Sequence, residues 1–360
     1  MKNKQLFLLL TLLTFCYPIA AQNLNNVKYP EMHSVDSRKE LVLPDIPGYK
    51  TLKCDFHMHT VFSDGIVWPE YRVEEAWHEG LDAISITDHI ENQPSKKYIL
   101  GDHNSSYEIA LPTAIEKDIL LIRGGEITRS MPPGHLNALF VEDVNKLDVK
   151  KVTDALEEAK LQGAFILWNH PGWQAQQPDT CLWMPMHQEL FEKGLIHGIE
   201  VFNEFEYYPV VLDWCIDRKL TVTGNSDIHG IVSEVYDLRK QYRPITLVFA
   251  KERSIPAIKE AMFAGRTLAL FNNILAGKED LLLQFFRASV TVKSTGRGNL
   301  YEVFNNSLIN FEIVNGKDDL LIIPAESTIL ISIKNGDYKN VKVRNLYTGS
   351  KSCLTVSSLK

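Results

Sequence analysis

Residues 54–65 read C-D-F-H-M-H-T-V-F-S-D-G, and this stretch carries the first candidate metal ligands of the chain. Residues 51–56 have the pattern of a short buried strand. His57 and His59 stand two positions apart at its end, and in an extended chain side chains at i and i+2 point to the same face. The sequence therefore predicts two imidazoles side by side at the carboxyl end of a strand. With Asp64 in the loop that follows, this is a metal-binding geometry.

The same pattern recurs along the chain, where an apolar run ends next to a residue that can bind metal. Such runs are predicted as strands at residues 81–87, 119–123, 136–141, 164–168, 198–202, 220–223 and 245–250. Helical spacing is found between them at residues 70–80, 106–117, 151–162, 210–219 and 254–265. The candidate ligands at the strand ends are His57, His59, Asp64, His89, Glu126, His135, His170, Asp227 and His229.

Strands that alternate with helices predict a parallel sheet with crossover connections. Because nearly every strand ends in a candidate ligand, we expect a closed or distorted (β/α) barrel whose carboxyl-end loops build one site. An open doubly wound sheet is the alternative, but it would not easily bring ligands from five or more strands to one place.

The region after about residue 276 shows no helical signal. Short strands are expected at residues 285–292, 301–304, 309–314, 320–323, 328–333 and 341–346, with glycines between several of them. We therefore expect a small all-β, sandwich-like C-terminal domain. The predicted division is a signal peptide at 1–21, a leader or linker at 22–48, a barrel at 49–275 and the β-rich domain at 276–360.

The N-terminus and the charge bear on location and partners. Lys2 and Lys4 precede the apolar run 6–15 and then small residues, as in a secretory signal peptide cleaved before Gln22. We expect an exported protein, periplasmic or secreted, with lipid attachment at Cys16 as the alternative. The chain has 360 residues and a formal net charge of -7, and no Lys/Arg cluster. No specific nucleic-acid partner and no membrane span are therefore expected.

Six imidazoles and three carboxylates are too many for one zinc ion with its usual four ligands. They suit two or three divalent ions that share a bridging carboxylate. The set contains no cysteine, which favours a catalytic site open to water. Zinc, manganese and iron all accept such nitrogen and oxygen ligands.

The chain resembles the PHP (polymerase and histidinol phosphatase) family of metal-dependent phosphoesterases. The matching pieces cover about residues 50–270 and are D-F-H-M-H-T-V-F-S-D-G, I-T-D-H, G-G-E-I-T, G-H-L-N-A, N-H-P-G and G-N-S-D-I-H. The resemblance implies a distorted (β/α)7 TIM-like barrel. It also implies three metal sites: His57, His59 and Asp227 with the bridging Glu126; Glu126 with His135 and His170; and Asp64 with His89 and His229.

The resemblance further implies a hydrolase of phosphomonoesters or phosphodiesters. With the signal peptide, we expect an exported enzyme that acts on small substrates and uses a hydroxide bridging the metal ions. The expected catalytic residues are Asp227, Glu126 and His229, with Asp227 orienting the attacking water. Arg129 and Arg266 are candidates for gripping a phosphate and Trp173 for stacking on the substrate. Surface ion pairs and a rim aromatic are the alternatives for these three. Alternative functions are a non-catalytic metal-stabilised binding protein, a 5'-3' exonuclease-like PHP activity and an amidohydrolase-like attack on carbon.

Overall fold

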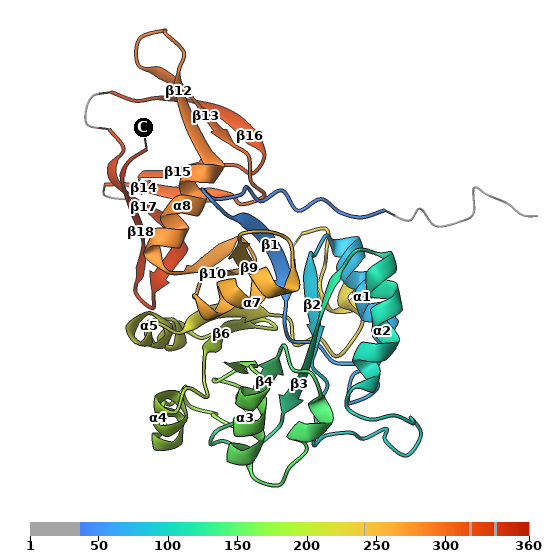
Figure 1. The fold of residues 1–360 in the computed structure, drawn as a ribbon. Helices are drawn as coiled ribbons and strands as arrows, with labels where there is room; N and C mark the ends of the chain where they lie inside the picture. Colours follow the sequence, from blue (N-terminus) through green and yellow to red (C-terminus); the bar gives the residue numbers. More distant parts are fainter. Residues whose placement is uncertain (1–36, 241, 317–318, 335–336, 360) are drawn as a thin grey trace, which may run out of the picture. The chain divides into compact units, whose positions relative to one another are not determined.

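The computed structural model describes residues 37–240, 242–316, 319–334 and 337–359 (Figure 1). The predicted signal peptide at residues 1–21, Cys16 and the first part of the predicted leader lie outside these residues. The later part of the leader is described. Leu41 and Ile46 of that part are buried in a large apolar cluster.

The larger of two sheets in the described chain has 15 strands. Those before residue 278 are β1 (Lys50–Asp55), β2 (Ala83–Ile86), β3 (Leu120–Ile127), β4 (Leu136–Leu139), β5 (Phe165–Trp168), β6 (Gly198–Asn203), β7 (Glu206–Tyr207), β8 (Thr221–Asn225), β9 (Ile245–Ala250), β10 (Thr267–Phe271) and β11 (Ile274–Gly277). Their order in the sheet is β11-β10-β9-β1-β2-β3-β4-β5-β6-β7, with β8 also paired to β6. The strands predicted at residues 81–87, 164–168 and 245–250 are thus confirmed as β2, β5 and β9.

The sheet is mixed, so the prediction of a parallel sheet is only partly right. Strands β1, β2 and β3 run parallel, as do β5, β6 and β8. Strand β4 lies antiparallel between β3 and β5, and β9 lies antiparallel to β1. Only a short loop joins β3 to β4, which permits a hairpin but is too short for the crossover that a parallel neighbour needs.

Helices lie between the strands, as the sequence spacing predicts. They are α1 (Pro69–Glu79), α2 (Ser105–Glu116), α3 (Val152–Leu161), α4 (Pro185–Glu192), α5 (Pro209–Arg218), α6 (Val232–Val235) and α7 (Ile255–Phe263), with a 3-10 turn η2 (Val144–Leu147). Sequence reasoning did not identify α4 or the short α6. Helix α4 begins at Pro185, and Met184 and His187 form a capping box at its N-terminus.

The sheet curves, because strands that are distant in its order share one buried cluster. Leu52 and Cys54 of β1 pack in the same cluster as Phe165 and Leu167 of β5. Alternate residues of a strand face the same side, so this face of β1 points toward β5. Strand β8 likewise lies against β9 and β10: the Thr246 hydroxyl donates to the Gly224 carbonyl (2.8 Å), and that of Thr267 to the carbonyl of Val222 (2.6 Å).

The C-terminal region begins with a helix, α8 (Glu279–Ser289), and the expectation that helical structure ends at residue 276 is wrong. Leu281, Leu282, Phe285, Phe286 and Ser289 are buried on one face at helical spacing, and the first turn carries the acidic Glu279 and Asp280. The apolar run 285–292 belongs partly to this helix and partly to the next strand. Read alone, it has the composition of a strand.

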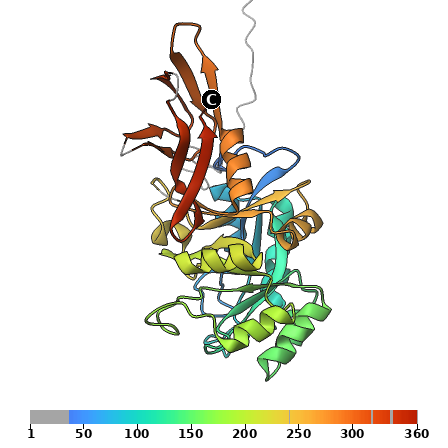
Figure 2. The same cartoon turned by 90° about the vertical axis from the view of Figure 1, so that its left-hand side faces the viewer.

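The remaining strands are β12 (Val290–Ser294), β13 (Leu300–Asn305), β14 (Phe311–Asn315), β15 (Asp319–Ile323), β16 (Ser327–Ser332), β17 (Lys339–Gly349) and β18 (Ser352–Ser358). Strands β12, β13 and β16 form a three-stranded sheet. The others continue the large sheet, because β17 pairs with β11. Both views show this orange-to-red segment gathered at one end of the described chain (Figures 1 and 2). The strands are those of a β-rich region, while a domain boundary at 275/276 stays a prediction.

Candidate metal centre

The ends of several strands meet at one edge of the curved sheet, and the nine predicted ligands lie there. His57 and His59 follow β1, His89 follows β2, and His170 follows β5. Glu126 lies near the end of β3 and His135 just before the antiparallel β4, so these two are neighbours across the hairpin. The remaining members of the set are Asp64 in the loop after β1, and Asp227 and His229 after β8.

Backbone hydrogen bonds fix these strand ends to one another. The amide of Asp227 donates to the carbonyl of His57 (2.9 Å), and that of His59 to Ile228 (3.0 Å). The amide of Glu126 donates to the Asp88 carbonyl (3.1 Å). The ligand-bearing loops are therefore positioned by continuing the strand pairing, which makes the site rigid.

Two of the candidate ligands have left-handed backbone conformations. Asp227 has φ +49° and His170 has φ +25°, values that are uncommon for residues other than glycine. Both conformations are held by hydrogen bonds, since the Asp227 amide donates to His57 and the His170 amide to the Glu200 carboxylate (2.8 Å). Strain that is maintained in this way is typical of functional sites.

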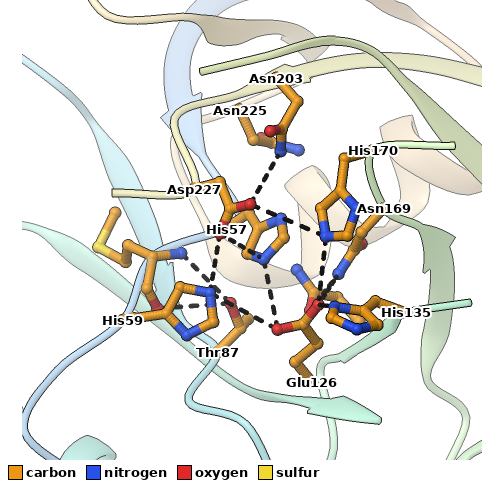
Figure 3. A network of polar contacts seen from close by, with 12 residues as sticks. His57, His59, Thr87, Glu126, His135, Asn169, His170, Asn203, Asn225 and Asp227 are labelled. Atoms are coloured by element: carbon orange, nitrogen blue, oxygen red, sulfur yellow. Dashed lines mark hydrogen bonds and ion pairs between the residues drawn. The ribbon is translucent and has the colours of Figure 1, made fainter. Parts of the chain in front are cut away.

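The inner part of the site surrounds Asp227 and Glu126 (Figure 3). Asp227 Oδ1 lies 3.0 Å from His57 Nε2 and 2.9 Å from His59 Nε2. Glu126 Oε2 is 3.6 Å from each of these two nitrogens. His57, His59 and Glu126 are fully buried. Two imidazole nitrogens and two carboxylate oxygens around one point are a set of ligands that a divalent cation such as zinc accepts.

The second carboxylate oxygen of Glu126 faces the other side of the site. Glu126 Oε1 lies 2.9 Å from His135 Nδ1 and 3.7 Å from His170 Nε2. His89 Nδ1 lies 2.6 Å from Oε2. Glu126 thus stands between two sets of imidazoles, in the place that a bridging carboxylate would take.

The outer part of the site is centred on Asp64. Its Oδ1 lies 3.1 Å from His229 Nε2 and 3.4 Å from His89 Nε2. His59 belongs to this group as well as to the inner one. The grouping into three separate metal sites therefore stays a prediction, because His57, His59 and His89 each lie in two of the clusters.

The carboxylates and imidazoles of the site shift one another's pKa values. Burial raises the pKa of Glu126, but the neighbouring His89, His57 and His135 lower it more, and its pKa lies well below the usual range. The pKa of Asp227 is held low in the same way, chiefly by His57. Burial lowers the pKa of His89, but Glu126 and Asp64 raise it to about 10. The pKa of His59 falls to about 3 through burial and the nearby His229. Both carboxylates are thus ionised and available to cations.

The donor atoms fit divalent ions. Several buried side-chain atoms make no hydrogen bond of suitable geometry with a described residue, although oppositely charged atoms lie close to them. In the centre these are His57 Nε2, Glu126 Oε2, His135 Nδ1 and Asp64 Oδ1. A buried polar atom without a partner is costly and needs an explanation. Here the unpartnered atoms are those that the clusters of candidate ligands direct inward. A bound cation would satisfy them together.

Sequence reasoning missed Glu200, which lies in the middle of β6 and is fully buried. The Nδ1–H of His57 donates to its Oε1 (2.8 Å), and Asn203 and Asn225 donate amide hydrogen bonds to the same carboxylate (2.8 and 3.0 Å). This contact leaves Nε2 of His57 free to bind a metal. The available signal was a carboxylate inside the apolar run 198–202, which is unusual for a buried strand.

Replacing Glu200 with glutamine is expected to weaken metal binding by 10- to 100-fold, on the order found for residues that orient a ligand. The amide keeps the shape but loses the charge that fixes the His57 tautomer. Metal titration by calorimetry measures the effect. Glu157→Gln, an exposed change on α3, is the matched control. Equal affinities for the two variants would contradict the positioning role.

A cavity of about 580 Å³ opens onto the centre. Six of the nine candidate ligands line it, together with Arg129 and Trp173. The Arg129 guanidinium pairs with Glu91 and donates to the Val149 carbonyl (2.8 Å). Trp173 is 42% exposed, and its ring lies 5.4 Å from that of His170. Both residues are thus at the rim of the site.

Arg266 is not brought to the site. Its guanidinium pairs with Glu260, lies 4.7 Å above the Tyr49 ring and donates to the Phe249 carbonyl (3.1 Å). Tyr49 precedes β1, whereas the candidate ligands follow its other end. The structure therefore gives Arg266 the surface ion pair that the sequence left as the alternative, and a contact with the phosphate is excluded by position.

The fold and the centre define a mixed α/β protein whose strand ends carry His/Asp/Glu clusters that could hold metal ions. A similar solved structure agrees with this class. The chain is 42% identical to a two-domain protein from Bacteroides vulgatus ATCC 8482 containing a predicted PHP-like metal-dependent phosphoesterase. That match covers 90% of this chain and 99% of the other, with a TM-score of 0.86. The chain therefore belongs to the PHP-like metal-dependent phosphoesterases.

Two other solved structures are more distant. One is of a protein from Bifidobacterium adolescentis ATCC 15703 that is inferred to be a metal-dependent phosphoesterase, with 19% identity and a TM-score of 0.38. The other is of an amidohydrolase from Chromobacterium violaceum with bound sulfate and no metal, with 13% identity and a TM-score of 0.39. Each match covers 49% of this chain and 87% of the other. No family model and no curated protein matches the chain. Within the described residues, no helix is long and apolar enough to cross a membrane.

Proposed function

We propose that this protein hydrolyses small phosphomonoesters or phosphodiesters at a centre of two or three divalent ions, zinc, manganese or iron. The observation that carries the proposal is the convergence of nine His, Asp and Glu side chains from different strands, with unpartnered buried atoms among them. A purely structural ion would need four ligands and no open cavity. The cavity beside these residues has the size of a small-molecule site.

The proposed fold of the catalytic part is a distorted (β/α)7 barrel formed by residues 49–275. Support comes from the shared cluster of β1 and β5 and from the hydrogen bonds that hold β8 against β9 and β10. In such a barrel the carboxyl-end loops form a single active site.

Three groups of residues would hold the ions. They are His57, His59 and Asp227 for the first, His135 and His170 for the second with Glu126 between the two, and Asp64, His89 and His229 for the third. When bound, such ions lower the pKa of a coordinated water and offset negative charge on the phosphoryl oxygens.

The chain's own residues then orient the reaction. In hydrolysis the water oxygen attacks phosphorus, and the P–O bond to the alcohol breaks on the opposite side. Asp227 lies between His57 and His170 and is positioned to orient the water and accept its proton. Asp64 and His229, at the partly exposed side, would hold the water that protonates the departing alcohol. Arg129 and Trp173 at the rim are proposed to contact the substrate.

The test is hydrolysis of bis(p-nitrophenyl) phosphate and of p-nitrophenyl phosphate by protein loaded with manganese or zinc, with metal analysis alongside. We expect nitrophenol release from at least one ester, loss of release after chelation, and recovery on reloading. Release from neither ester by metal-loaded protein would favour a binding protein instead. Ester and lactam substrates in the same assay detect an attack on carbon.

We also propose that the protein is exported through the signal peptide at residues 1–21 and acts outside the cytoplasm. The charged start, apolar run and small residues before Gln22 support this proposal. N-terminal sequencing of protein recovered from the producing cell's exterior or periplasm tests it, and a mature chain that still begins at Met1 would contradict it.

A further inference from the structure

A second cavity, here called the outer cavity, adjoins the one that opens onto the metal centre. It has a volume of about 550 Å³ and is lined by the loop from Gly172 to Cys181 and by residues 206–210. Gln174 and Glu206 line both cavities, so the two spaces are neighbours with a shared wall. A substrate whose phosphate lies at the metal centre would reach the outer cavity past the side chains of Gln174 and Glu206.

The charge of this region is distinctive for a phosphate-ester site. Among the described residues that line either cavity, Arg129 alone has a cationic side chain other than histidine, and Glu91 pairs with it. The outer cavity contains two carboxylates, Asp179 and Glu206, and Glu204 lies in the wall of the inner one. A second negative group on the substrate would meet these carboxylates without a compensating cation.

The other groups of the outer cavity both donate and accept hydrogen bonds. The Tyr208 hydroxyl donates to Glu206 Oε2, and no described residue donates to Glu206 Oε1. Asp179 is an exposed acceptor, while the Gln174 amide and Thr180 hydroxyl offer donors. The ring of Tyr207 adds an apolar face. An alcohol hydroxyl can both donate to carboxylates and accept from an amide or hydroxyl, whereas an ammonium group can only donate.

We propose that the outer cavity binds the alcohol part of the phosphate ester and that this alcohol is a neutral polyol. The inference rests on the proposed function and adds the chemical class of the substrate. Glu206 acts as the specificity-determining residue, because it lines both cavities, accepts hydroxyl hydrogen bonds and repels anionic alcohols.

The test compares three esters with different charges on the alcohol: glycerol 3-phosphate (neutral), 3-phosphoglycerate (anionic) and ethanolamine phosphate (cationic). If the protein cleaves diesters only, the same alcohols are compared as their methyl phosphodiesters. We expect kcat/KM for the glycerol ester to exceed that for the glycerate ester by about 10-fold, because the carboxylates repel the anion. We expect it to exceed that for the ethanolamine ester several-fold, because an ammonium group cannot accept the hydrogen bonds that Gln174 and Thr180 offer. Equal or faster cleavage of the glycerate or ethanolamine ester overturns the proposal.

Two variants test whether Glu206 and Thr180 select the alcohol part of the substrate. Glu206→Gln is expected to bring the glycerol-to-glycerate ratio of kcat/KM close to one, since it removes the repelling charge and retains the shape. Thr180→Val is expected to lower kcat/KM for the glycerol ester several-fold, because it removes a hydroxyl hydrogen bond. Glu157→Gln, an exposed change on α3 outside the lining of both cavities, is the control for the loss of a carboxylate. An unchanged ratio in Glu206→Gln overturns the proposal.

The failure of this inference is distinguishable from the failure of the proposed function. If p-nitrophenyl esters are hydrolysed but the phosphate esters of the three alcohols are cleaved at equal rates, the outer cavity does not select polyols. The hydrolase proposal then stands. If metal-loaded protein hydrolyses no ester at all, both proposals are wrong.

Discussion

Replacing Glu126 with glutamine is expected to lower the hydrolysis of phosphate esters by about 10³-fold, the order of effect when a central electrostatic group is removed. The carboxylate is fully buried, and its two oxygens face different sets of imidazoles. The variant removes the charge that would join two ions and changes the shape little. Glutamine Oε1 can still accept the hydrogen bond that Asn169 donates to Glu126 Oε1 (2.9 Å).

The measurement combines kcat at saturating manganese or zinc with the number of metal ions per chain. Circular dichroism shows whether the variant is folded, and Glu157→Gln serves as the control for removal of one negative charge from the chain. We expect fewer bound ions together with the lost activity. A variant with full metal content and unchanged turnover would disprove the bridging role of Glu126.

Removal of the metal ions is expected to produce the largest change in stability. A ligand present at about 1,000 times its dissociation constant stabilises the folded state by about 4 kcal/mol. For a chain of this size that corresponds to a fall in Tm of about 5–10 °C on chelation. The physical reason is that unpartnered buried atoms, such as His57 Nε2 and Glu126 Oε2, lose the cation that satisfies them. Differential scanning calorimetry with and without chelator measures the shift.

The same measurement has a pH dependence whose sign follows from the histidines. Without metal, neighbouring carboxylates raise the pKa of His89 to about 10 and that of His57 above its ordinary value. Both rings are therefore in the cationic form, with two N–H groups each, at neutral pH. A ring must lose one of its two N–H protons before a nitrogen lone pair is available to the cation, and metal binding therefore releases protons. Affinity, and the Tm difference, should increase as pH rises from about 6 to 8. Calorimetric titrations in buffers of different ionisation enthalpy count the protons, and a value of zero would contradict this account.

The sequence alone identified the residues that gather in the centre. An H-x-H pair at the end of a strand requires two imidazoles on one face, and that rule depends only on the backbone between His57 and His59. The other candidate ligands were found because each one ends or begins a short apolar run. Since strand ends meet at one edge of a sheet, a purely local pattern predicted a shared location. Their role as metal ligands remains a proposal.

Only the tertiary structure decided which residues meet. The sequence predicts the strand β6. The contact of Glu200 with His57 instead depends on the pairing of β6 with β8, and both of these strands are far from β1 in the sequence. The sequence makes Arg266 a candidate phosphate ligand. The pairing of β9 with β1 instead places it near the amino end of β1, whereas the candidate metal ligands follow the carboxyl end. The apolar composition of residues 285–292 predicts one strand, although the first half of this run completes the buried face of α8. Periodicity is set by neighbours a few residues away, whereas side-chain partners are set by strand register and packing between distant segments.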